Sequence, residues 1–245
     1  MKKVYFLFAI LFMAVVVSNA QTTGKAGPNA TWTLTDDGIL TISGKGVMVN
    51  DYGYLEYKHF RNKITEVVIE EGITAICKSA FEDCENIAEI DIPKTISRVD
   101  DKAFCNCKSL ESISFPKYCT VKNLGKYAFA NCTNLKNIKW PTLLQSIPQG
   151  CFYNCISLDS IAIPNFVSVI DNGYTNAGMP GAFENCRSLE KIDFGLGIKK
   201  IGQDAFSGCH SLRKVEFPSN ISYISSGAFR NCAALERIII NSPPL

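Results

Sequence analysis

Eleven cysteines and two histidines are the side chains of this 245-residue sequence best suited to nucleophilic or zinc chemistry. Seven of the cysteines recur at spacings of 23, 25, 23, 31, 23 and 23 residues, at Cys84, Cys107, Cys132, Cys155, Cys186, Cys209 and Cys232. Zinc sites use closely grouped ligands such as C-x₂-C, which this register does not supply. The close pair Cys105 and Cys107 has no second pair beside it. The pattern predicts structural thiols, with no metal and no cofactor.

The one adjacent Cys–His pair is Cys209 and His210. Neighbouring residues of an extended segment point to opposite sides, so this pair is not expected to form a nucleophile and its base. Phosphate-loop and dinucleotide fingerprints are missing from the sequence. Glu89 and Asp91 could meet the separation of about 5–9.5 Å that a glycoside hydrolase needs, but so could many surface pairs. We therefore predict that the protein is not an enzyme, and a glycan- or peptide-acting hydrolase remains a distant alternative.

The first twenty residues predict export. Lys2 and Lys3 precede an apolar run from Val4 to Val17, and small residues follow up to Ala20, where we expect cleavage. A membrane anchor is the alternative, but the run is shorter than the roughly 20 residues that span a bilayer. We expect residues 1–20 to be a signal peptide, and the mature protein to be extracellular, on the cell surface or periplasmic, without stable membrane insertion. Loss of Lys2 and Lys3 brings the net charge of +2 close to zero, which argues against nucleic acid as a partner.

The recurring cysteines belong to a longer unit, A-F-x-x-C-x-x-L-x-x-I-x-I-P-x-x-I-x-x-I. Its phenylalanine returns in the same register, at Phe81, Phe104, Phe129, Phe152, Phe183, Phe206 and Phe229. One such unit cannot bury its own apolar residues, so a period of this length predicts a stacked solenoid. In each unit we expect a short parallel strand ended by proline, a second weaker strand, and a tight or 3₁₀ turn.

The stacking suggests how the cysteines are used. Side chains at one repeat position should lie about 4.8 Å apart along the pairing direction, and their Cβ atoms then exceed the disulfide range of about 3.5–4.5 Å. Reduced cysteine packs well as a small buried hydrophobe. Cys119 and Cys151 occupy apolar positions of the unit and should also be core. Cys77 and Cys105 lie outside the apolar register, so they are the candidates for reaction or pairing, and their redox state stays open.

Residues 21–62 precede the repeats and are expected to form a cap. Alternating residues on both sides of Asp37-Gly38 predict a β-hairpin, whose apolar side chains Trp32, Leu34, Leu40 and Ile42 would cover the open end of the stack. Gln21–Pro28 is polar and is expected to be loose. The aromatic segment 50–61 should seal the junction with the repeats, and a sugar or peptide site is the alternative. Residues 63–245 then form the solenoid of about eight repeats.

The repeat unit resembles the BspA-like leucine-rich repeat of bacterial secreted and surface proteins, from Ile64 to about Ile240. The segment Thr31–Gly44 also resembles the one that precedes such repeats. The resemblance implies a mostly β, right-handed leucine-rich-repeat coil, capped here by the N-terminal hairpin. It also implies adhesion to host matrix proteins or contacts between bacteria. The family has no shared catalytic or binding motif, so no functional residue is carried over from it.

The outward strand positions are the candidate ligand contacts, since they form columns down one face. The charged ones are Glu89, Asp91, Lys139, Lys191, Asp193, Lys214, Glu216 and Arg237. Tyr174 is a further candidate, because it lies in the insertion 171–181 that lengthens one repeat from 23 to 31 residues. An ordinary solvated face is the alternative for each of them.

The predicted function is that of a protein binding an extracellular protein or glycan, with an adhesin as one form. The alternative is a structural or assembly component of the cell envelope. The sequence leaves the oligomeric state open.

Overall fold

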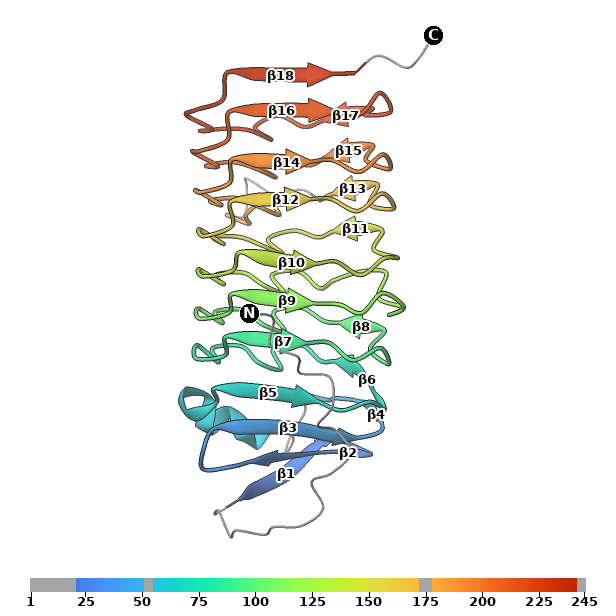
Figure 1. The fold of residues 1–245 in the computed structure, drawn as a ribbon, viewed down its shortest axis with the longest axis vertical. Helices are drawn as coiled ribbons and strands as arrows, with labels where there is room; N and C mark the ends of the chain where they lie inside the picture. The colour runs from blue at the N-terminus through green and yellow to red at the C-terminus, as the bar shows by residue number, and fades with distance from the viewer. Residues whose placement is uncertain (1–20, 51–54, 172–177, 242–245) are drawn as a thin grey trace, which may run out of the picture.

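The computed structural model describes residues 21–50, 55–171 and 178–241. They form one stack of coils that rises from a blue cap to the red end of the chain (Figure 1). The predicted signal peptide 1–20 and Tyr174 lie outside the described residues. In the described part of the chain, helices long and apolar enough to cross a membrane are missing. The domain boundaries remain predictions.

The cap is a four-stranded sheet in the order β1-β2-β3-β5. Its strands are β1 (Thr22–Gly27), β2 (Ala30–Leu34), β3 (Ile39–Gly44) and β5 (Glu66–Ile69). The first two pairings are antiparallel, and β3 then pairs with β5 in parallel. The predicted hairpin is confirmed as β2–β3, and its four apolar side chains are buried. The antiparallel strands of the cap are therefore joined to the parallel strands of the stack through the β3–β5 pairing.

One expectation about the cap is wrong. Gln21–Pro28 was expected to be loose, but β1 pairs with β2 from Thr22 to Gly27, with one irregularity between Lys25 and Gly27. Its sequence TTGKAG lacks apolar alternation, so its side chains did not predict a strand. The strand is held by backbone pairing with β2. Gly24 stands opposite Trp32, and a Cβ on this glycine would lie 2.5 Å from the indole Nε1. The glycine lets β1 pass against the large ring.

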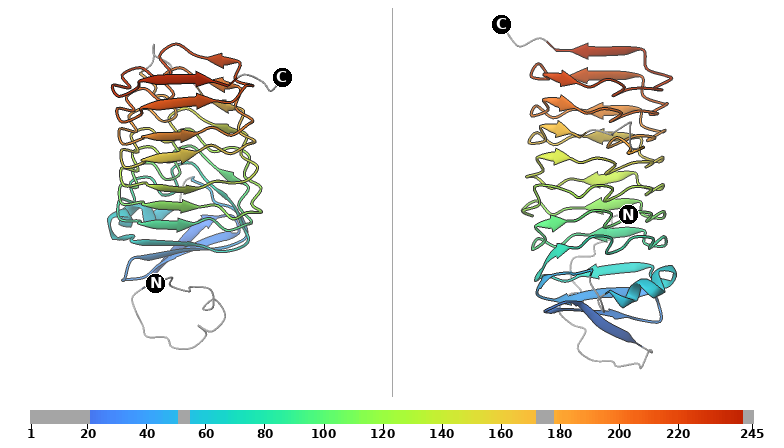
Figure 2. Two further views of the ribbon diagram at one scale, coloured as in Figure 1. Left: turned by 45° about the horizontal axis from the view of Figure 1, so that its top comes forward. Right: turned by 180° about the vertical axis from the view of Figure 1, so that it is seen from behind.

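Most coils carry one strand of a first face and one short strand of a second face (Figure 2). The first face holds β7 (Glu89–Asp91), β9 (Ser112–Ser114), β10 (Asn137–Lys139), β12 (Ser160–Ala162), β14 (Lys191–Asp193), β16 (Lys214–Phe217) and β18 (Arg237–Ile240). The second holds β4 (Gly46–Val47), β6 (Ile73–Ile76), β8 (Arg98–Val99), β11 (Ser146–Ile147), β13 (Val169–Ile170), β15 (Lys200–Ile201) and β17 (Tyr223–Ile224). Pairings between coils are parallel, and they are in register except for a shift between β4 and β6. Isolated bridges through Asn123 and Leu124 continue the second face between β8 and β11. The predicted mostly β solenoid is confirmed.

The core is a continuous column of aromatic rings. From Phe81 to Phe229, successive phenylalanines stack with ring centroids 5.2–5.4 Å apart. Tyr57, in the 3₁₀ helix η1 (Glu56–Lys63), stacks 6.2 Å below Phe81 and meets the edge of Trp32 at 5.6 Å. This aromatic segment therefore seals the junction between cap and repeats, as expected for its described residues.

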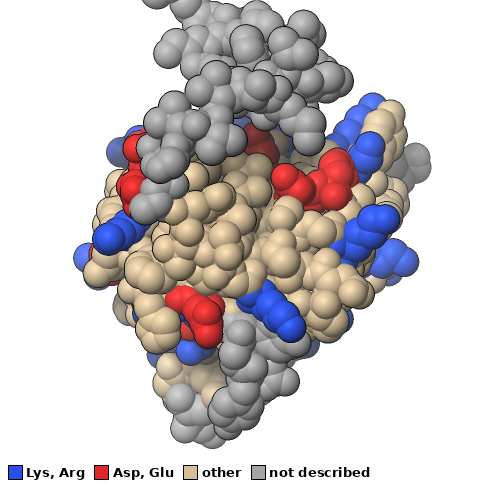
Figure 3. Space-filling view, turned by 90° about the horizontal axis from the view of Figure 1, so that it is seen from below, with Lys and Arg blue, Asp and Glu red and all other residues tan. Residues whose placement is uncertain are grey.

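The cap end of the molecule carries few charges at its centre. Seen from below, the described surface is mainly uncharged in the middle, and the Lys, Arg, Asp and Glu side chains lie mostly around its rim (Figure 3). The apolar cap residues Trp32 and Ile42 are nevertheless buried beneath this surface. The sheet thus closes the stack without exposing its core.

Truncation of one ring should weaken the whole stack. We expect Phe129→Ala to lower the free energy of unfolding by about 3–5 kcal/mol, because it empties a site packed between two rings. Tyr118→Ala removes a side chain that is 80% exposed, and it should change the value by less than about 0.5 kcal/mol. Urea denaturation followed by circular dichroism measures both. Equal losses in the two variants would contradict a core built on the ring column.

Candidate functional site

The predicted contact residues come together on the first strand face. Parallel register places Glu89 beside Ser112 and Asp91 beside Ser114, and the same column continues to Lys139. On the upper coils, the same register pairs equivalent outward positions, including Lys191 with Ser160, Asp193 with Ala162, Lys214 with Arg237 and Glu216 with Ile239. All eight charged candidates are exposed, because the residues between them turn inward. Their arrangement in columns is as expected, and their role in binding stays a prediction.

The charges on this face follow an order along the stack. Glu89 and Asp91 lie near the cap. Lys214 and Glu216 form an ion pair on β16. Among the described residues, Lys139, Lys191 and Arg237 form no ion pair, so their charges are available to a partner.

The strand face is hollowed at its acidic end. A cavity of about 450 Å³ lies between β5 and β7, lined by Thr65, Glu66, Val68, Glu89 and Asp91 among others. These two strands belong to different hydrogen-bonded sheets, as do β10 and β12 and also β14 and β16. Glu66, Glu89 and Asp91 make the lining of this cavity acidic.

Catalytic or metal-binding arrangements do not emerge from the described residues. Cys209 is fully buried while His210 is exposed, as expected from their alternation. Groups of three or more His, Cys, Asp or Glu side chains that could hold a metal ion are missing from the parts of the chain that the structure describes. What the strand face offers chemically is therefore a row of charges and hydrogen-bonding groups on a rigid support.

The cysteine column has a specific structural use. Each of its thiols from the second onward donates a hydrogen bond to the phenylalanine carbonyl of the preceding coil, with Sγ–O distances of 3.2–3.4 Å. The six pairs are Cys107–Phe81, Cys132–Phe104, Cys155–Phe129, Cys186–Phe152, Cys209–Phe183 and Cys232–Phe206. All eleven cysteines are free thiols in the structure. The column thus supplies a donor for the phenylalanine carbonyl of six successive coils.

Two other thiols lie differently from expectation. Cys77 and Cys105 were placed outside the apolar register, yet both are buried. Cys119 and Cys151 are buried core residues, as predicted. Among the cysteines, Cys232 is the half-exposed one. It is therefore the most accessible thiol, ahead of the two that the sequence indicated.

The buried thiols should make the fold sensitive to alkaline pH. Burial raises the pKa of Cys84 and Cys186 from 9.0 to about 12, so the folded state keeps its protons where the unfolded chain loses them. Their stabilisation is complete below pH 9 and is lost as the pH rises from 9 toward 12, by about 1.4 kcal/mol per thiol at pH 10. The urea midpoint of the native protein should fall between pH 8 and pH 10, and that of Cys186→Ala should fall less steeply, because this variant lacks one of the two thiols. A flat profile would contradict this account.

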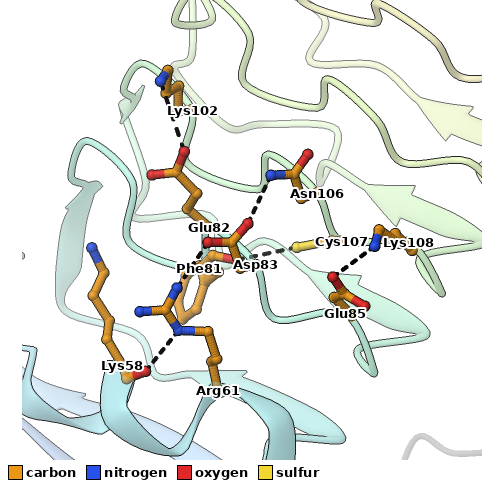
Figure 4. A network of polar contacts seen from close by, with 10 residues as sticks. All are labelled: Lys58, Arg61, Phe81, Glu82, Asp83, Glu85, Lys102, Asn106, Cys107 and Lys108. Carbon is orange, nitrogen blue, oxygen red and sulfur yellow. Dashed lines mark hydrogen bonds and ion pairs between the residues drawn. The ribbon is translucent and has the colours of Figure 1, made fainter.

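A polar ladder runs beside the thiols, and sequence reasoning missed it. Asn106, Asn131 and Asn154 each donate from the side-chain amide to the coil below, at 2.7, 2.8 and 3.0 Å. The ladder ends on Asp83, which Arg61 of η1 binds at 2.8 Å (Figure 4). These repeat residues have φ values near 60°, which Asn and Asp tolerate better than most side chains. The signal was Asn or Asp directly before the repeat cysteine.

This ladder can be separated from its backbone conformation by two substitutions. Asn131→Ala removes two side-chain hydrogen bonds and places an alanine at φ 60°, so we expect a loss of about 1–3 kcal/mol. Asn131→Gly removes the same bonds but adopts positive φ freely, so it should be less destabilising by about 1 kcal/mol. Thermal and urea unfolding of the two variants measure the difference. An alanine variant as stable as the native protein would show that the ladder contributes nothing.

In-register parallel strands, one stacked ring and one buried thiol per coil define a leucine-rich-repeat solenoid. The family described as "BspA type Leucine rich repeat region" matches residues 54–177 and 179–244, in six copies. The chain belongs to this family, as the repeat unit suggested. A comparison with curated protein sequences gives no match.

Solved structures of bacterial leucine-rich repeat proteins are similar to this chain. One from Eubacterium ventriosum is 21% identical and covers 90% of this chain and 85% of its own, with a TM-score of 0.43. One from Bacteroides ovatus is 21% identical, covers 87% and 70%, and has a TM-score of 0.49. A leucine rich cell surface protein from Faecalibacterium prausnitzii is 17% identical, covers 90% and 95%, and has a TM-score of 0.33.

Proposed function

We propose that this protein is exported and binds an extracellular protein through its strand face, as an adhesin does, without catalysing a reaction. The observation that carries the proposal is the repeated exposure of charges on a rigid, in-register surface. Lys139, Lys191 and Arg237 have no ion-pair partner among the described residues. Solenoids commonly use such extended faces for binding.

A protein fits this face better than a glycan. The acidic cavity at Glu89 and Asp91 and the cations higher in the stack form a row of mixed sign. Complementary charges on a partner protein would fix its register along that row. A neutral glycan would leave these charges without counterparts.

The test is binding of the exported chain to immobilised matrix proteins, with a glycan panel beside them. The variant carries Lys139→Ser, Lys191→Ser, Lys214→Ser and Arg237→Ser. We expect saturable binding to a protein, weakened at least about tenfold in the variant and reduced by added salt. The reason is the loss of the positive half of the row.

A matched control removes four lysines elsewhere, in Lys94→Ser, Lys117→Ser, Lys122→Ser and Lys199→Ser. All four are exposed outside the strand face, so net charge changes equally while the face is kept. The control should bind as the native chain does. Equal loss in both variants would indicate non-specific charge attraction, and binding that survives the strand-face variant would remove the site from this face.

The alternative function is a structural or assembly component of the cell envelope. Its support is the last described strand, β18, where Ile238 and Ile240 are 48% and 58% exposed. Self-association that rises with concentration, with no protein or glycan bound in the panel, would favour this alternative.

A further inference from the structure

A second surface lies on the third side of the coil, where the chain turns from the second face back to the first. A cavity of about 810 Å³ runs there across coils from Lys102 to Arg230. Tyr127 and Tyr153 line its middle, and Glu184 and Asp204 line it with Arg230 toward the upper end. None of the strand-face candidates contributes to it. At about 4.8 Å per coil the groove is long enough for several linked sugar residues.

The groove coincides with small residues at one repeat position in two of the middle coils. Just before the repeat alanine, or the cysteine that replaces it, Lys102 and Tyr127 are followed by Gly150 and Gly181. The ring of Tyr127 lies over Gly150, where a Cβ would come within 2.5 Å of its Cδ1 and Cε1 atoms. Gly150 has φ +61°, which a glycine adopts without strain. The tyrosine is thereby held across the groove rather than extended into solvent.

The groove also contains a buried carboxylate whose ion pair is not a hydrogen bond. Asp204 is 8% exposed, and its Oδ1 atom has no hydrogen-bond partner. The nearest cation is Arg230, whose Nε lies 3.5 Å from that oxygen. Buried polar atoms in folded proteins are almost always hydrogen-bonded, and this carboxylate, which lines the groove, has capacity to accept a further hydrogen bond.

The surroundings of Asp204 limit the kind of donor. Lys102 and Arg230 balance Glu184 and Asp204, so the lining has no strong net charge. The backbone N–H of Gly181 donates to Glu184 Oε2 at 3.0 Å, and burial raises the pKa of this carboxyl. An apolar peptide segment would need hydrophobic pockets or a free sheet edge, and this turn surface has mostly polar lining side chains.

We propose that this groove binds a neutral oligosaccharide. Tyr127 and Tyr153 offer ring surfaces to the C–H faces of the sugars, and the carboxylate of Asp204 accepts a hydrogen bond from a sugar hydroxyl. The groove is separate from the strand face, so this site goes beyond the proposed function. A single molecule can then hold a protein on one side and a glycan on another.

The test uses the exported chain and neutral linear oligosaccharides of glucose, mannose, galactose and N-acetylglucosamine, titrated by calorimetry. We expect saturable binding of at least one series, weakened at least about tenfold by Tyr127→Ala and by Asp204→Asn. Asp204→Asn keeps size and tolerates the backbone φ of 54° at this residue. Tyr153→Ala is a third, independent variant, because Tyr153 neither contacts Gly150, as Tyr127 does, nor pairs with Arg230, as Asp204 does.

Two controls separate this proposal from the strand-face one. Tyr118→Ala removes an exposed tyrosine outside the groove, and the strand-face quadruple variant removes the cations of the other surface. Both should bind the oligosaccharide as the native chain does. Native-like urea midpoints establish that each groove variant is folded. No binding in any series, or binding that all three groove variants retain, would overturn the proposal, whatever the strand face is found to bind.

Discussion

The structure depends on the fact that one coil cannot bury its own core. Each phenylalanine from Phe81 to Phe206 stacks with the aromatic rings of the two neighbouring coils, at centroid distances of 5.2–6.2 Å. The stack must therefore begin on a ring that is held by something else. Tyr57 meets this need, since it stacks on Phe81 and its hydroxyl donates to the carbonyl of Ala80 at 3.1 Å. The cap, through Trp32, then supports Tyr57 from below.

The turn that contains the repeat cysteine must satisfy a different requirement, which is to provide hydrogen-bond partners for its polar groups. Cysteine is small enough to stay within the core and still donates to a phenylalanine carbonyl of the coil below. Asparagine before it accepts the positive φ of the turn and links neighbouring turns by amide hydrogen bonds. The spacing of 31 residues between Phe152 and Phe183 leaves the rings 5.2 Å apart, so the longer repeat does not interrupt the ring column. Core and turn thus fix the period, and the outward positions are left free to vary.

How much could be predicted from the sequence follows from this division. Residues that recur because every coil needs them, such as Phe129 and Cys132, revealed the solenoid and its parallel register. The hairpin was readable from Asp37-Gly38 between alternating segments. The strand β1 was missed because it is held by backbone pairing, which leaves no apolar pattern. The groove was not predicted. The ring of Tyr127 lies over Gly150 because this glycine has no side chain, and a single glycine does not stand out in the repeat pattern. The burial of Cys77 and Cys105 also depends on contacts between coils.

Function in such a molecule must reside where the repeat is broken or unconstrained. The strand face varies in charge while its backbone stays in register, so a partner there would be recognised by the order of side chains along the stack. The groove arises where small residues replace large ones and Met179 and Pro180 of the lengthened repeat approach the lining. Asp204 is buried there, and its Oδ1 atom has an ion pair with Arg230 but no hydrogen-bond donor. Because this carboxylate also lines the groove, it is the buried charge of the turn side that a bound ligand could use, whereas the amides of the asparagine ladder are already occupied by one another.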